Sequence, residues 1–313
     1  MLTHILRRIE NLGLPVVAQL QPGLSTQAIE HWQEQLPFAL PTEVCMYYEW
    51  RNGYQHGLPR YDLLFPAGRV LSLESAINDY YKGLVKLEEQ LGENMLHQQM
   101  LPDTAALSYP YNIFVSPTIW HKNWLPVFDD ISNGYHIIIG NSQKQATTPI
   151  YFIWLEDGIY LAYDSLTSLL ETVATAYEMG AYYLDTEGYV CKNRAKLLPI
   201  VNHYNPRRRE YLLYTAGDAK TLEDLVKALA SSDNDIAANA TRALFLLGDA
   251  SVVELLIDQL RHEQPRARQL AARVLGELGE QRAIHPLLHT AAKDPDKFVR
   301  QYAKYALREL NSA

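Results

Sequence analysis

The C-terminal third of the chain has a hydrophobic pattern that repeats. From Thr221 onward, apolar residues recur at the i, i+3, i+4 and i+7 spacing of an amphipathic helix, a polar break follows, and a second, alanine-rich helical pattern comes next. The motif returns with a period of about 31 residues. Since one helix pair cannot bury its apolar face alone, we expect three pairs to stack into an all-α solenoid. Four sets of equivalent positions define the register: Leu222, Val253 and Ile284; Leu225, Leu256 and Leu287; Ala240, Ala271 and Ala303; Leu244, Leu275 and Leu307.

A partial repeat precedes these three pairs. The segment EYLLYTAGDAK (210–220) aligns one period before RALFLLGDASV (241–251), which places Leu213 over Leu244 and Gly217 over Gly248. We interpret it as a capping half-unit, so the solenoid is expected to cover residues 210–313.

Residues 1–190 mix helix and strand patterns and are expected to form one α+β domain. Helical spacing predicts helices over 2–12, 27–36 and 40–50, and two more that begin near Ser72 and near Asp164 or Ser165. Apolar runs separated by turn residues predict a short strand ahead of the Ser72 helix, a strand–turn–strand over 124–140 with its turn at 132–134, and a hairpin around Asp157 and Gly158.

Charge is distributed unevenly along the chain. Residues 1–191 carry a net charge of −12, whereas residues 192–216 carry +5. We expect residues 191–209 to be a basic linker whose arginines 207–209 are solvated and held near the acidic domain, in preference to a nucleic-acid site. An acidic domain repels nucleic acid and attracts a basic partner, although ordinary surface acidity accounts for the same charge.

Composition also bears on location and on cysteine chemistry. No early apolar run resembles a secretory signal and no stretch is long enough to cross a bilayer, so we expect a cytoplasmic protein without a membrane partner. Cys45 and Cys191 lie far apart and outside any CxxC spacing. They predict neither a disulfide nor a zinc site, and both are expected to be buried small hydrophobic residues.

The common catalytic motifs are absent from the sequence. There is no P-loop, no G-x-S-x-G, no H-E-x-x-H and no paired CxxC. Asp129 and Asp130 are neighbours on a predicted strand and would point to opposite faces, so we expect solvated acids at a hairpin edge rather than a catalytic pair. His285 and His289 have metal-ligand spacing but no third ligand in view. No catalytic, cofactor-binding or metal residue is therefore assigned.

Tyrosine is abundant, with 21 in the chain. The pairs Tyr80-Tyr81 and Tyr182-Tyr183 and the tyrosines of the 150–163 hairpin suit either a sheet core or a protein interface. The sequence leaves both interpretations open.

Four motifs in the first domain occur in an order similar to that found in one known family. They are Leu40-Pro41 with Tyr47, Tyr48, Trp50, Asn52 and Gly53; GRVLSLE from Gly68 to Glu74; NWLPV from Asn123 to Val127; and DSLTSLL from Asp164 to Leu170. Together they resemble the SUKH superfamily, which groups fungal Smi/Knr-type cell-wall regulators with bacterial immunity proteins. The segment 92–121 has no counterpart, and the acid that many members carry after the Trp-x-Pro strand is missing beyond Gly134.

The repeats resemble HEAT-like units of the type named after phycobilisome lyases. The sequences ARQLAA from Ala267 and VRQYA from Val299 stand where that family has its Val-Arg-x-x-Ala-Ala core. Ile236-Ala237 lacks the arginine, so we expect an Asp–Arg ladder between units to be incomplete there.

The two resemblances imply a SUKH-like α+β domain followed by a HEAT-like solenoid, and a non-enzymatic protein-binding module. The leading hypothesis is a bacterial immunity protein that sequesters a cognate toxin, and the acidic charge of the domain fits a basic one. A two-domain scaffold is the alternative, and a lyase-like enzyme or chromophore helper is a remote one. The resemblances imply these site residues: Tyr48, Trp50, Arg51, Asn52, Gly53, Trp124, Asp129, Asp130 and Gly134 for partner binding, and Arg268 and Arg300 in the HEAT-like core.

The helix over 40–50 allows one further prediction about side-chain direction. We expect Trp50 to pack inward and Arg51 to face solvent, with Asn52-Gly53 ending the helix through a left-handed residue.

Overall fold

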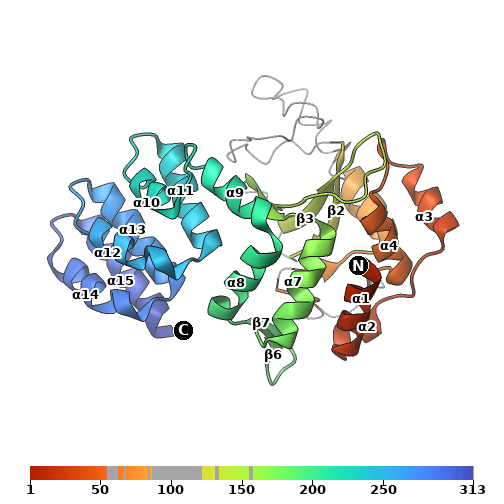
Figure 1. Cartoon of the computed structure of the whole chain (residues 1–313), viewed down its shortest axis with the longest axis horizontal. Coiled ribbons are helices and arrows are strands. Elements are labelled where there is room, and N and C mark those ends of the chain that lie inside the picture. Colours follow the sequence, from red (N-terminus) through yellow and green to blue (C-terminus); the bar gives the residue numbers. More distant parts are fainter. Residues whose placement is uncertain are drawn as a thin grey trace. The chain divides into compact units, whose positions relative to one another are not determined.

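The computed structural model describes residues 1–54, 63–66, 68–83, 85–86, 122–130, 134–154 and 158–312. The chain divides into two compact units, with the boundary between Arg208 and Arg209. The first combines a sheet with helices, and the second is entirely helical over its described residues (Figure 1). The expected fold class, an α+β unit followed by an all-α solenoid, is confirmed.

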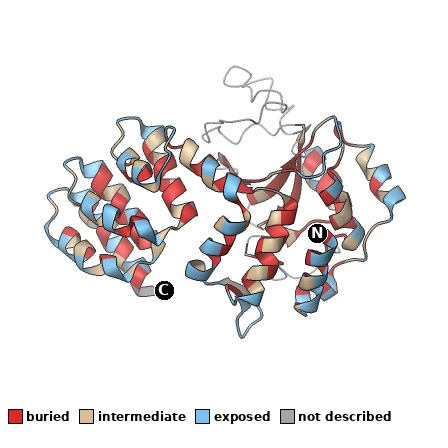
Figure 2. Cartoon of the chain, in the orientation of Figure 1, coloured by how far each residue is buried: buried red, intermediate tan, exposed pale blue. Residues whose placement is uncertain are grey.

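The first unit is built on an antiparallel sheet with strand order β1-β2-β3-β4-β5. The predicted short strand, the strand–turn–strand and the hairpin all form, although residues 131–133 and 155–157 of the two turns lie outside the described residues. Every residue of the second strand is buried, and Figure 2 shows how little of the sheet reaches solvent. The strands are β1 (Arg69–Val70), β2 (Trp124–Asp129), β3 (Gly134–Ile139), β4 (Ile150–Trp154) and β5 (Gly158–Tyr163).

The helices of the first unit include those that the sequence predicts. Local caps explain their starts: the Ser25 hydroxyl accepts from the Ala28 N–H, and Ser165 forms a reciprocal capping box with Ser168. A π-helix follows the short helix that Ser72 caps. The helices are α1 (Leu2–Asn11), α2 (Pro15–Gln19), α3 (Thr26–Gln33), α4 (Thr42–Trp50), α5 (Leu73–Ser75), the π-helix η1 (Ala76–Tyr81) and α7 (Leu166–Glu178).

The end of α4 differs in detail from the prediction. The helix stops at Trp50 and Arg51 is already extended, so the left-handed residue, Gly53 with φ +69°, comes later than a helix cap would. A Cβ on Gly53 would lie 2.3 Å from the Ser72 backbone nitrogen. The glycine therefore permits both the positive φ and the close approach of two chain segments.

Residues 191–209 are not a solvated linker. They contain strand β7 (Val190–Lys192, paired with β6, Tyr182–Leu184), helix α8 (Arg194–Tyr204) and the start of α9 (Pro206–Tyr214). Leu197, Ile200 and Val201 of α8 are buried in the core of the first unit, and Arg208 is 5% exposed. The charge-based expectation overlooked the i, i+3, i+4 spacing of these three apolar residues.

The acidic domain does hold the arginine run, but through the backbone. The two carboxylate oxygens of Asp164 accept the N–H groups of Arg207 and Arg208 at 2.8 and 2.7 Å, at the start of α9. A carboxylate at a helix N-terminus satisfies free N–H donors and complements the helix dipole.

The second unit contains the three predicted helix pairs. All residues of two register sets, Leu225, Leu256 and Leu287, and Ala240, Ala271 and Ala303, are completely buried, which confirms the repeat alignment. The pairs are α10 (Leu222–Ala228) with α11 (Asn234–Leu247), α12 (Val253–Gln259) with α13 (Pro265–Leu278), and α14 (Ile284–Lys293) with α15 (Lys297–Ser312); short 3-10 turns η3 (Ala250–Val252) and η4 (Gln281–Ala283) join them.

The two cysteines correct another expectation. Cys45 and Cys191 are free thiols of intermediate exposure, not buried hydrophobic residues. Cys45 lies within α4 and Cys191 within β7, and each residue is partly exposed to solvent.

Candidate protein-binding surfaces

Two of the predicted partner-binding residues belong to the core. Tyr48 is completely buried in α4, and burial raises the pKa of its hydroxyl. Trp124 at the start of β2 is 4% exposed. Neither side chain is accessible to a partner in this structure.

Asn52 and Gly53 join chain segments. The Asn52 side-chain oxygen accepts the Leu73 N–H at 3.0 Å, and its backbone N–H donates to the Gln21 carbonyl. The Gln21 N–H in turn donates to the Gly53 carbonyl. The Asn-Gly motif thus connects the end of α4 with the start of α5 and with the segment ahead of α3.

Trp50 and Arg51 lie together at the surface, in an arrangement the sequence did not predict. Both are partly exposed, and one carboxylate oxygen of Glu10 accepts from Trp50 Nε1 at 2.9 Å and from Arg51 Nη2 at 3.0 Å. The guanidinium lies 5.6 Å from the centre of the indole ring. The expected division into an inward tryptophan and an outward arginine is therefore not observed, because Glu10 of α1 holds both side chains.

Asp129 is buried, which corrects the expectation of a solvated acid. The register of β1 and β2 places Arg69 directly opposite it, and the guanidinium binds both carboxylate oxygens, with Nε to Oδ1 at 2.7 Å. The Asp129 side chain is 6% exposed and that of Arg69 is 35% exposed. The hydrogen bonds to the Asp129 carboxylate raise the pKa of Arg69, so the guanidinium stays charged.

Two tyrosines extend this ion pair toward the surface. The Tyr80 hydroxyl on η1 donates to Asp129 and accepts from Arg69, each at 3.0 Å. Its ring packs edge-on against Tyr135 of β3, with centroids 5.7 Å apart. Burial and the nearby carboxylate raise the pKa of Tyr80 to about 12. We name Arg69, Tyr80, Asp129 and Tyr135 the Arg69 cluster.

Asp130 and Gly134 shape the adjoining turn. The Gly134 N–H donates to Asp130 Oδ1 at 2.6 Å, and a Cβ on Gly134 would lie 2.4 Å from Asp130 and 2.6 Å from Phe152. Glycine is required at this position because no side chain fits there. The two adjacent acids have separate partners, so they do not act on one atom.

The tyrosine pairs divide between core and surface. Tyr81 and Tyr182 are buried, while Tyr80 is half-buried and Tyr183 is 49% exposed. The core interpretation therefore holds for Tyr81 and Tyr182, and the interface interpretation stays a prediction for Tyr80 and Tyr183.

Sequence reasoning missed Glu43, the most heavily bonded buried carboxylate of the first unit among the described residues. Its two oxygens accept the N–H groups of Thr148, Leu166 and Thr167 and the Thr167 hydroxyl, at 2.7 to 3.2 Å. It thereby joins α4 to the start of α7 and to the segment ahead of β4. The only sequence signal is an acid in the first turn of a helix, which does not distinguish a buried anchor from a dipole contact.

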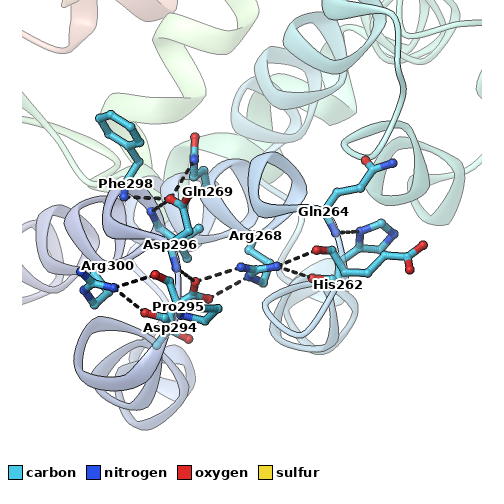
Figure 3. A network of polar contacts seen from close by, with 12 residues as sticks. His262, Gln264, Arg268, Gln269, Asp294, Pro295, Asp296, Phe298 and Arg300 are labelled. Atoms are coloured by element: carbon cyan, nitrogen blue, oxygen red, sulfur yellow. Dashed lines mark hydrogen bonds and ion pairs between the residues drawn. The ribbon is translucent and has the colours of Figure 1, made fainter.

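The predicted HEAT-like arginines form a regular network (Figure 3). Arg268 binds both carboxylate oxygens of Asp294 in the next unit, at 2.8 and 2.9 Å, and donates to the carbonyls of His262 and Glu263. Arg300 donates to the equivalent carbonyls, those of Asp294 and Pro295. Each arginine thus holds the loop inside its own helix pair, and Arg268 also joins two pairs.

The ladder is incomplete in the first unit, as predicted. Ala237 occupies the arginine position and is buried, and His262 stands where the next unit has Asp294. Even so, the local turn persists: Ser231, His262 and Asp294 each accept the N–H group two residues later through a side-chain atom. The loop geometry repeats although the ion pair does not.

The described residues include neither a helix fit to cross a membrane nor a cluster of side chains fit to hold a metal. Among the described residues, no helix combines the length and apolar character needed to cross a bilayer. Within the same residues, no three His, Cys, Asp or Glu side chains gather to hold a metal, and His285 and His289 are exposed on α14.

Comparisons with known families match both units. Residues 23–172 match the model of the SMI1 / KNR4 family (SUKH-1), and residues 222–308 match the model of HEAT repeats. The chain carries a SUKH-1 region followed by HEAT repeats. Comparison with curated proteins found no match. The family matches agree with the order of the motifs and with a protein-binding module.

Proposed function

We propose that this SUKH-1 protein is a non-enzymatic immunity protein that acts in the cytoplasm of the producing cell. It would bind and sequester a cognate toxin with a basic surface. The SUKH-1 match carries the proposal, and the net charge of −12 over residues 1–191 supports a basic partner. Opposite charge on two proteins accelerates their encounter and disfavours wrong partners.

The Arg69 cluster is the surface we propose for toxin recognition. It combines two partly exposed tyrosines with an arginine, and Tyr and Arg are enriched among residues that dominate binding energy. Its side chains come from β1, η1, β2 and β3 and are fixed by Asp129 before any partner arrives. Pre-fixed side chains lose little conformational entropy on binding.

The pair Trp50 and Arg51, held by Glu10, is the second surface we propose on this unit. Its residues are also fixed in advance, and an indole with a guanidinium offers both apolar area and charge. A partner that covers both surfaces would contact Trp50, Arg51 and the side chains that Asp129 holds, and Trp50, Arg51 and Asp129 are all among the predicted partner-binding residues.

Co-expression with toxin genes encoded beside this one tests the proposal. Wild-type protein should restore growth against its cognate toxin and co-purify with it. The double variant Tyr80→Ala/Tyr135→Ala should lose rescue and weaken binding by at least about tenfold, equal to about 1.4 kcal/mol. Arg69 is unsuitable for this test because its removal leaves Asp129 buried without its cation.

Tyr183→Ala is the matched control. It removes a tyrosine of the first unit that is 49% exposed and lies on β6, away from the Arg69 cluster. Rescue should be unchanged in this variant. If no neighbouring toxin binds the wild-type protein, or if the double variant protects as well as the control, the proposal fails.

A further inference from the structure

Helix α15 presents an exposed face that carries two aromatic rings. Phe298 and Tyr305 are 50% and 48% exposed, and their spacing of seven residues places them on one side of the helix. The opposite side is apolar and packs into the unit through the buried residues Val299, Ala303, Ala306 and Leu310.

Comparison of α15 with the equivalent helix α13 shows how the exposed side of α15 differs from a helix-packing surface. On α13, Gly276 lies against α15, since a Cβ there would be 2.5 Å from the Cα of Ala306. The repeat register places Lys304 and Arg308 of α15 where α13 has Ala272 and Gly276. Two long cations thus occupy the positions that small residues use for close helix packing, so α15 cannot receive a further helix pair in the way α13 receives α15.

On this face of α15, basic side chains lie beside the two aromatic rings. Lys297 Nζ lies 4.9 Å from the ring centre of Phe298, and the Arg308 guanidinium carbon lies 5.6 Å from that of Tyr305. Gln301 Nε2 donates to the Tyr305 hydroxyl at 2.9 Å. These contacts order the side chains of the face.

The two acids ahead of α15, Asp294 and Asp296, are engaged elsewhere. Asp294 is bound by Arg268, and Asp296 accepts the N–H groups that begin α15. Within α15 the sequence holds one acid, Glu309, against four basic residues. The exposed side of α15 therefore carries both aromatic rings and an excess of positive charge.

We propose that this face, formed by Lys297, Phe298, Gln301, Lys304, Tyr305 and Arg308, binds an acidic segment of a protein partner. Carboxylates of the segment pair with the cations, and its apolar side chains cover the two rings. A second copy of the chain is a poor occupant, because two such faces would oppose like charges. The inference is independent of toxin binding by the first unit and gives the HEAT repeats a partner of their own.

Fluorescence anisotropy with the full chain tests it. The probe is a labelled helical peptide with glutamates on one side and leucines on the other, and its counterpart carries lysines in place of the glutamates. The glutamate peptide should bind with an affinity that falls as salt rises, and the lysine peptide should not. Lys304→Ala/Arg308→Ala and Phe298→Ala/Tyr305→Ala should each weaken binding by about tenfold or more.

Lys227→Ala/Arg261→Ala is the control, since it removes two exposed basic residues on α10 and after α12. Binding should be unchanged in this variant. Equal weakening by the control, or equal binding of both peptides, would show only general attraction to basic surface and overturn the proposal. A dimer in solution that Phe298→Ala/Tyr305→Ala dissociates would overturn it in favour of a second copy.

Discussion

At the scale of single residues, His136 shows how completely the sheet core excludes charge. It is 5% exposed, and the rings of Phe65, Phe152 and Tyr163 surround it with centroids 4.8 to 6.1 Å away. Its Nδ1 has no hydrogen-bond partner among the described residues. Burial alone lowers the pKa of this histidine to about 3.

This histidine should make the stability of the first unit depend on pH. Because its folded pKa lies below the ordinary value of 6.5, the unfolded chain binds the proton more readily, and the contribution is full above pH 6.5 and declines as pH falls toward 3. Urea unfolding should show a loss of up to about 1.4 kcal/mol per pH unit in this window. His136→Phe should flatten that slope.

His31→Gln is the control because His31 is largely exposed on α3. Its pH profile should match that of the wild type. An unchanged slope in His136→Phe would show that other groups cause the acid sensitivity.

At the scale of elements, the sequence predicted contacts between residues that are near one another in the chain, but not contacts between residues far apart in it. Ser25 and Ser165 cap helices three residues ahead, so spacing alone predicts them. Glu43 binds residues 105 and 124 positions away, and Asp129 meets Arg69 across 60 positions. Such anchors depend on the completed fold, which is why the burial of Asp129 was mispredicted and Glu43 was missed.

Glu43→Gln should destabilise the first unit by about 2 to 3 kcal/mol, since the amide NH₂ that replaces one carboxylate oxygen opposes the donors around it. Urea unfolding, followed by tryptophan fluorescence, measures the change. Glu49→Gln is the control in the same helix, because Glu49 is exposed and its carboxylate accepts a hydrogen bond from the Thr26 hydroxyl. It should change stability by less than about 0.5 kcal/mol, and equal losses would refute the anchor role of Glu43.

The Arg268–Asp294 pair should be the strongest single polar link in the described HEAT region. Both side chains are under 10% exposed, so Arg268→Ala leaves a buried carboxylate and should cost about 3 kcal/mol or more. Arg261 and Asp258 form a matched pair that is over 70% exposed, and Arg261→Ala should be almost neutral. Comparable unfolding midpoints for the two variants would contradict this account of the ladder.

At the scale of the whole molecule, sequence patterns predicted the order of the parts better than their limits. The helix pairs followed from a period of about 31 residues, and the strands of the first unit from apolar runs between turns. The boundary was placed too early, because the net charge of residues 191–209 concealed the apolar side of α8. Of the Arg69 cluster, the predicted site residues included only Asp129. Three-dimensional packing brought Arg69, Tyr80 and Tyr135 to it and showed that Tyr48 belongs to the core.

The central claim is that the SUKH-1 unit binds and neutralises a basic toxin, and a binding titration of the purified protein with the toxin encoded beside it tests this most directly. The account predicts a saturable one-to-one complex whose association slows as salt rises, which abolishes toxin activity at equimolar ratio and is lost in Tyr80→Ala/Tyr135→Ala. A toxin that stays fully active, with no heat of binding at any ratio, would contradict it.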